Sequence, residues 1–226
     1  MGLSGDGRDP SRVGWGVLGG TFDPVHYAHL AIAEQARDQL GLRGVLFVPA
    51  LLPPHKPDQT PADAQDRLRM VELAVAGDPA FAVSDVELQR SGPSYTVDTA
   101  EALLPRLGPD PWFILSTEAL WGLPTWHRPR RLLELVRLAV MPRFATPAPD
   151  AAWFDRHFPG QADRIRFLEG PDLGHSASGI RRLVADGHSI RYLVPPAVER
   201  YIREHDLYRT AAAVGGPHMP EDPIDR

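Results

Sequence analysis

The sequence predicts an α/β fold, in which a doubly wound parallel sheet carries helices on both faces and is followed by C-terminal helices. Short apolar runs alternate along the chain with segments whose apolar residues recur at helical spacing. The first apolar run ends in Gly-Gly and leads into a helical segment. Parallel sheets of this kind bind ligands beyond the carboxyl ends of their strands, so the turn after the first strand is the first place to look for a site.

The elements are predicted in order from their apolar patterns, with turn residues between them. Gly41 ends the first helix, and the prolines of residues 51–57 make that stretch a loop because proline blocks regular pairing. Residues 144–163 are rich in Pro, Ala and Asp and are expected to form a connecting excursion. The strands are expected at 13–18, 45–49, 81–88, 112–115 and 138–141, and the helices at 26–40, 63–76, 97–107, 176–184 and 196–204.

Bulk composition narrows the class of protein. The 226 residues are 43% hydrophobic, enough for one α/β domain, which we expect over 13–209 between a flexible N-terminal arm at 1–12 and a disordered tail at 210–226. The net charge of −5 gives no global basic field for nucleic acid, and no apolar run is long enough to span a membrane. The absence of cysteine excludes disulfides and thiolate metal sites, which fits a cytoplasmic protein.

The segment from Gly19 to His29 is the strongest candidate for a site. Glycines allow close approach of the backbone to a phosphate, and a helix N-terminus offers N–H donors. His26 and His29 are three residues apart, so both rings can lie on one face of the first helical turn and donate hydrogen bonds to phosphoryl oxygens. A plain turn, a pair of surface histidines or part of a metal site would also fit these residues.

The eleven residues Gly-Gly-Thr-Phe-Asp-Pro-Val-His-Tyr-Ala-His closely resemble the signature of the nucleotidyltransferase superfamily with the (H/T)xGH motif. The departure is Ala28, where the family usually has glycine. The resemblance implies a Rossmann-like nucleotidyltransferase fold. It also implies catalytic roles for His26 and His29, and ATP-binding roles for Gly19, Gly20, Thr21 and Phe22.

Further segments resemble the bacterial nicotinate-nucleotide adenylyltransferases, and the likeness covers roughly residues 13–208. They are Pro-Pro-His-Lys at 53–56, Arg-Leu-Arg-Met at 67–70, Ser-Tyr-Thr at 94–96 and Leu-Pro-Thr-Trp-His at 123–127. The resemblance implies adenylyl transfer from ATP, carried with Mg²⁺, to nicotinate mononucleotide. Lys56 would meet a phosphate, Tyr95 and Thr96 would bind the nicotinate carboxylate through backbone N–H groups, and Trp126 would stack on the pyridine ring. Arg67 and Met70 are interpreted as structural.

Near the C-terminus, residues 175–181 resemble the family segment Ile-Ser-Ser-Thr-x-Ile-Arg. The resemblance implies that Ser178 and Ile180 contact ATP and that Arg181 holds its β- and γ-phosphates. The residues alone would equally suit a capped helix with a surface arginine.

Besides Ala28, the chain departs from the family at 175–178, where His175, Ala177 and Ser178 replace Ile, Ser and Thr, and at 116–118. Ser116-Thr117-Glu118 stands where the family usually has Gly-Ala-Asp. The two added side chains are expected to crowd the nucleotide, and Glu118 is expected to hold a ribose hydroxyl with a longer side chain.

Two alternative functions remain open from the sequence. One is adenylyl transfer to another acceptor, such as nicotinamide mononucleotide, phosphopantetheine or FMN. The other is a nucleotide-binding regulator that is catalytically weak. The sequence does not fix the oligomeric state, and a homo-oligomer is compatible with it.

Overall fold

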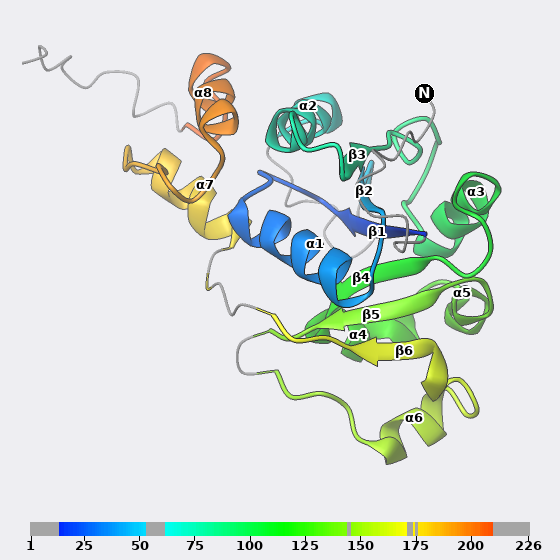
Figure 1. Cartoon of the computed structure of the whole chain (residues 1–226). Helices are drawn as coiled ribbons and strands as arrows, with labels where there is room; N and C mark the ends of the chain where they lie inside the picture. Colours follow the sequence, from blue (N-terminus) through cyan, green and yellow to red (C-terminus); the bar gives the residue numbers. More distant parts are fainter. Residues whose placement is uncertain (1–13, 53–61, 144–145, 171–173, 175, 210–226) are drawn as a thin grey trace, which may run out of the picture.

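Six parallel strands form one sheet in the order β3-β2-β1-β4-β5-β6 (Figure 1). The computed structural model describes residues 14–52, 62–143, 146–170, 174 and 176–209. The strands are β1 (Trp15–Gly20), β2 (Gly44–Pro49), β3 (Phe81–Val83), β4 (Trp112–Ser116), β5 (Arg137–Met141) and β6 (Ile165–Phe167). The fold class predicted from the sequence is therefore confirmed.

Helices connect successive strands and close the chain. The α-helices are α1 (Tyr27–Gln39), α2 (Ala64–Val75), α3 (Thr96–Leu107), α4 (Thr117–Gly122), α5 (Pro129–Leu135), α6 (Ala151–His157), α7 (Ala177–Ala185) and α8 (Pro196–Glu204). Two short 3-10 helices are η1 (Leu123–Thr125) and η2 (Ala162–Arg164). None of the helices in the described ranges is long and apolar enough to cross a membrane.

Alternate strand residues feed two separate cores. On β1, Val17 packs with α3, α4, α5 and α6, whereas Leu18 packs with α1, α2, α7 and α8. The same alternation continues on β2, where Leu46 and Phe47 face opposite sides. Helices thus cover both faces, as the nearly continuous apolar strands predict.

The strand order places a switch point at β1. β1 pairs with β2 on one side and with β4 on the other, so the connections that leave these strands diverge at their carboxyl ends. Ligands of doubly wound sheets bind in the crevice at this position. Figure 1 also shows α7 beside the start of α1, and the N–H of Tyr27 donates to the carbonyl of Leu193, between α7 and α8, at 3.1 Å. The C-terminal region thus contacts the turn after β1.

The structure corrects several predicted boundaries. The strand expected over 81–88 ends at Val83, and the chain then turns, with the N–H of Leu88 donating to the carbonyl of Asp85 at 2.8 Å. Beyond Val83, the buried residues of this predicted strand are Ser84 and Glu87, which belong to no strand. The Gly-Gly pair also ends β1, and the connection starts after it.

The predicted excursion over 144–163 contains α6, which Asp150 caps by accepting from the N–H of Trp153 at 2.9 Å. Three further elements, α4, α5 and β6, were not predicted. β6 has three residues and α4 and α5 have six or seven, too short for a clear apolar period. The predicted N-terminal arm and C-terminal tail lie outside the described residues.

Candidate phosphate-binding site at the carboxyl end of the first strand

His26 and His29 come together at the start of α1. His26 is the N-cap residue, and its backbone N–H donates to Nδ1 of His29 at 3.2 Å. The two rings stack, with centroids 3.8 Å apart. Because Nδ1 of His29 accepts this bond, a neutral His29 carries its proton on Nε2. The turn therefore holds an imidazole N–H donor in a fixed orientation.

The pKa of His29 lies well below its ordinary value of 6.5. The main cause is desolvation, followed by the neighbouring His26 and the positive charge of Arg143. His29 is consequently neutral at pH 7 and acts there as a hydrogen-bond donor without adding a full charge. Two stacked imidazoles also favour this state, since a second proton would place like charges in contact.

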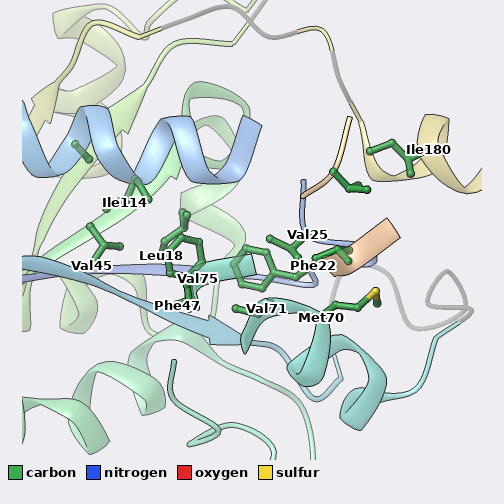
Figure 2. Packing of buried hydrophobic residues seen from close by; sticks show 14 of the residues in the cluster. Leu18, Phe22, Val25, Val45, Phe47, Met70, Val71, Val75, Ile114 and Ile180 are labelled. Atoms are coloured by element: carbon green, nitrogen blue, oxygen red, sulfur yellow. The ribbon is translucent and has the colours of Figure 1, made fainter. Parts of the chain in front are cut away.

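Phe22 forms the floor of the turn. It has a φ of 53° and is 2% exposed, with its ring edge-on to His29 at 5.0 Å and tilted against Phe47 at 5.8 Å. Figure 2 shows Phe22 and Val25 beside Phe47 and Met70 in the buried cluster. The buried side chain leaves only the backbone of Phe22 for the predicted ATP contact, and its ring packs edge-on against His29.

The two glycines have different roles. A Cβ on Gly20 would lie 3.1 Å from the ring of Phe22, so glycine at this position lets the ring pack. A Cβ on Gly19 would meet no atom of the described residues within 4 Å. The open face at the strand end is thus at Gly19, where the predicted approach of a nucleotide has room.

Arg67 of α2 holds the surrounding loops. It is 1% exposed, and its guanidinium donates to four carbonyl oxygens, at distances of 2.6 to 3.3 Å. The acceptors are Thr21 on the turn and Ala50, Leu51 and Ala62 on neighbouring segments. Desolvation lowers the pKa of Arg67, but a guanidinium remains charged at neutral pH. The structural role predicted for Arg67 is confirmed by these contacts.

Arg181 reaches the turn from α7. Its Nη1 donates to the backbone carbonyl of Asp23 at 2.7 Å and lies 3.6 Å from Oδ2 of the same residue. Asp23 is itself 2% exposed, and its Oδ1 accepts from the hydroxyl of Tyr208 at 2.7 Å. The structure thus places Arg181 against the turn that also leads into the two histidines. Asp23 lay within the motif without an assigned role, and Tyr208 carried no sequence signal.

The start of α7 clarifies two further predicted contacts. Ser176 is the N-cap, with its Oγ accepting from the N–H of Gly179 at 3.1 Å, and Ser178 is exposed with its Oγ 3.3 Å from that of Ser176. A hydroxyl at Ser178 is therefore available to a ligand. The side chain of Ile180 is 2% exposed in the core, which leaves only its backbone for the predicted ATP contact.

Contrary to the expectation from the sequence, the side chains at 116 and 117, where the chain departs from the family, do not crowd the site. Ser116 caps α4 by accepting from the N–H of Ala119 at 3.2 Å, and Thr117 turns inward to donate to the carbonyl of Met141 at 3.1 Å. Glu118 is exposed and pairs with Arg143, with 3.3 Å between Oε2 and Nε. Arg143 was not predicted from the sequence as part of the site. The signal that could have identified it is a cation shortly after β5, at the carboxyl edge of the sheet.

The predicted acceptor residues gather at the start of α3. Tyr95 is its N-cap residue, and its ring stacks on His127 at 4.4 Å, which places Trp126 and His127 beside this helix end. The N–H of Tyr95 donates to the carbonyl of Pro93 at 3.1 Å, so the N–H groups available to a carboxylate begin at Thr96. Tyr95 and Trp126 both pack against the core that contains Val17.

Ser94 does not cap α3 but holds the loop before it. Its buried Oγ accepts from the N–H of Leu51 at 3.0 Å and ties the segment to the end of β2. Lys56, the remaining predicted catalytic residue, lies outside the described residues.

Comparisons with known proteins agree with this geometry. The cytidylyltransferase-like family matches residues 17–183. A "probable nicotinate-nucleotide adenylyltransferase" of Dehalococcoides mccartyi is 41% identical over 196 residues, covering 85% of this chain and 96% of that protein. A Synechococcus protein of the same name is 45% identical over 202 residues, covering 88% of this chain and 97% of that protein.

Solved structures share the fold. Nicotinic acid mononucleotide adenylyltransferase of Plasmodium falciparum complexed with NaAD superposes with a TM-score of 0.69 at 18% identity, covering 87% of this chain and 98% of that chain. The same enzyme complexed with APC gives a TM-score of 0.66 at 17% identity, covering 86% of this chain and 96% of that chain. The family match and the sequence relatives show that the chain belongs to the cytidylyltransferase-like family, among the nicotinate-nucleotide adenylyltransferases.

Proposed function

We propose that this protein transfers the adenylyl group of ATP to nicotinate mononucleotide, giving deamido-NAD and pyrophosphate in NAD biosynthesis. The observation that carries the proposal is the paired His26 and His29 at the start of α1, at the switch point of the sheet and on the turn that Arg181 contacts through Asp23. The names of the sequence relatives support the choice of acceptor.

The reaction needs positioning and charge stabilisation more than proton transfer. A phosphate oxygen of nicotinate mononucleotide attacks the α-phosphorus of ATP, a new P–O bond forms, and the bond to the β-phosphate oxygen breaks to release pyrophosphate. The second pKa of a phosphate monoester is near 6, so the nucleophile is already mostly dianionic at pH 7. The protein must bring two anions together and stabilise the charge that moves to the leaving pyrophosphate.

The phosphate side of the site supplies the donors for this task. His26 and His29 would donate to the phosphoryl groups, with the start of α1 adding backbone N–H groups and a positive dipole end. Arg181 and Lys56 would hold the β- and γ-phosphates as cations, and Ser178 would add a hydroxyl. The backbone of Gly19, Gly20 and Thr21 would lie along the nucleotide.

Mg²⁺ is proposed to enter on the triphosphate of ATP. Within the described ranges, no group of three or more His, Cys, Asp or Glu side chains could hold a metal ion. A divalent ion bridging phosphate oxygens needs few protein ligands, so it would arrive as part of the substrate.

The acceptor side would select the acid. A nicotinate carboxylate suits the N–H groups at the start of α3, where Thr96 is the first helical residue. Trp126 would stack on the pyridine ring. The amide of nicotinamide mononucleotide lacks the negative charge that a helix N-terminus favours, which makes it the weaker acceptor.

Measurement of pyrophosphate release from ATP tests the proposal, with nicotinate mononucleotide, nicotinamide mononucleotide, phosphopantetheine and FMN as separate acceptors. Release only with nicotinate mononucleotide, or fastest with it, is expected. Binding of ATP without turnover on any acceptor would instead favour a nucleotide-binding regulator.

A further inference from the structure

The hydroxyl of Tyr208 is connected to the phosphate side of the site through one buried carboxylate. Tyr208 follows α8 and donates to Oδ1 of Asp23 at 2.7 Å. Asp23 lies on the turn between β1 and α1, three residues before His26, and is 2% exposed. A segment near the end of the described chain therefore contacts the turn that carries both histidines.

Asp23 also holds the cation expected to meet the phosphates of ATP. Its carbonyl accepts from Nη1 of Arg181 at 2.7 Å, and its Oδ2 lies 3.6 Å from the same nitrogen. The carboxylate is thus placed between a tyrosine hydroxyl and a guanidinium. The backbone carbonyl of Asp23 holds Arg181 by a hydrogen bond, and the carboxylate adds an ion pair to the same nitrogen.

The ionisation of Asp23 depends on the groups that face it. Burial raises its pKa, whereas the hydrogen bond from Tyr208 and the charges of Arg181 and Arg67 act in the opposite direction, with a smaller contribution from the backbone of Ala62. These groups come from the C-terminal segment, α7, α2 and the segment before α2. Among them, only Tyr208 donates a side-chain hydrogen bond to Oδ1, so it both orients the carboxylate and favours its charged form.

We propose that Tyr208 is a positioning residue for adenylyl transfer: its hydroxyl orients the carboxylate of Asp23, and that carboxylate adds an ion pair to the hydrogen bond that holds Arg181 at the turn. The inference rests on the proposed use of Arg181 for the phosphates of ATP. The C-terminal segment thereby has a role in ATP binding, although it lies far in the sequence from the motif at 19–29.

The Tyr208→Phe variant tests the inference because it removes the hydroxyl and keeps the ring. ATP affinity, measured by calorimetry, is expected to fall about 10-fold, the size typical of a hydrogen bond to a charged group. The acid limb of the pH profile of kcat/KM for ATP is expected to move to higher pH, because Asp23 without its donor takes up a proton more readily. An ATP affinity and an acid limb both equal to those of the wild type would overturn the proposal.

Tyr201→Phe is the matched control. Tyr201 lies on α8, and its hydroxyl donates to Oδ1 of Asp66 at 2.8 Å, a bond of the same chemistry in the same C-terminal region but away from the turn. This variant is expected to keep the ATP affinity and the pH profile of the wild type. Equal losses in both variants would mean a general loosening of the C-terminal helices and would contradict a role specific to Tyr208.

A double-mutant cycle tests the route through Arg181. In the Arg181→Ala background, Tyr208→Phe should have little further effect on ATP affinity, whereas additive losses would contradict the proposed route. Asp23→Asn provides an independent reading if Tyr208→Phe does not fold. It keeps the shape and removes the charge, so ATP affinity should fall, and an ATP affinity equal to that of the wild type would contradict the proposal.

Calorimetry with ATP alone separates this inference from the proposed function. If the wild type does not turn over nicotinate mononucleotide, the acceptor assignment fails while the ATP-binding comparison between Tyr208→Phe and Tyr201→Phe still decides the inference. If turnover is normal and Tyr208→Phe binds ATP as the wild type does, the inference fails alone.

Discussion

The backbone N–H of His26 donates to Nδ1 of His29 at 3.2 Å, and this bond fixes the tautomer of His29. The bond leaves Nε2 of His29 as the N–H donor. The sequence spacing predicted that both rings would lie on one face, and the stacked rings confirm it. The proposed chemistry depends on this donor.

Replacing His29 by asparagine should separate structure from chemistry. The side-chain oxygen of asparagine can still accept near the position of Nδ1, but the donor at Nε2 is lost. We expect kcat to fall about 100-fold or more, as for other donors that stabilise transition-state charge. The circular dichroism spectrum should match the wild type. Full activity in His29→Asn or in His26→Ala would refute a catalytic role for the pair.

The lowered pKa of His29 predicts how stability changes with pH. The unfolded chain has the ordinary value of 6.5, so it takes up a proton as pH falls while the folded protein does not. This group therefore lowers the stability of the wild type as pH falls through and below that value. Denaturant unfolding near pH 7 and near pH 5.5 should show a smaller loss in His29→Asn than in the wild type. The same loss in both proteins would mean that His29 titrates normally.

Replacing Arg67 should lower the free energy of unfolding more than replacing its neighbour Arg69. Arg67→Met leaves four carbonyl oxygens around the turn without their donor, and we expect the free energy of unfolding to fall by about 3 kcal/mol or more. Arg69 on the same helix makes an exposed pair with Glu72 at 2.9 Å. Arg69→Met should cost about 1 kcal/mol or less. Similar losses of unfolding free energy in the two variants would contradict the structural role of Arg67.

Glu118 provides a test of the sugar contact implied by the family. In the structure its carboxylate pairs with Arg143 near His29. Glu118→Asp should raise KM for one of the nucleotide substrates by a few-fold, because the shorter side chain changes the reach of the carboxylate. An unchanged KM for both substrates would count against contact of Glu118 with a ribose and leave the Arg143 pair as its role.

The sequence predicted the fold well where patterns were long or chemically distinct. The helix at 26–40 and its end at Gly41, which has a φ of 62°, followed from apolar spacing and one glycine. The short elements α4, α5 and β6 have too few residues to show a period. The strand predicted beyond Val83 shows that alternation alone does not separate a strand from a packed turn.

The candidate site was predictable in part for a similar reason. The motif at 19–29 pointed to His26 and His29, and the separate family segment at 175–181 pointed to Arg181. The contacts that hold them are long-range and leave no local pattern. Arg67 reaches Thr21 across 46 positions and Tyr208 reaches Asp23 across 185, so neither contact could be read from neighbouring residues. The inward turn of Thr117 likewise depends on the carbonyl of Met141 on another strand.

The most direct test of the account is pyrophosphate release from ATP, with nicotinate and nicotinamide mononucleotide as competing acceptors. We predict that the wild type uses nicotinate mononucleotide with the higher kcat/KM and that His29→Asn loses this activity while it stays folded. Faster turnover of nicotinamide mononucleotide, or undiminished turnover in His29→Asn, would contradict it.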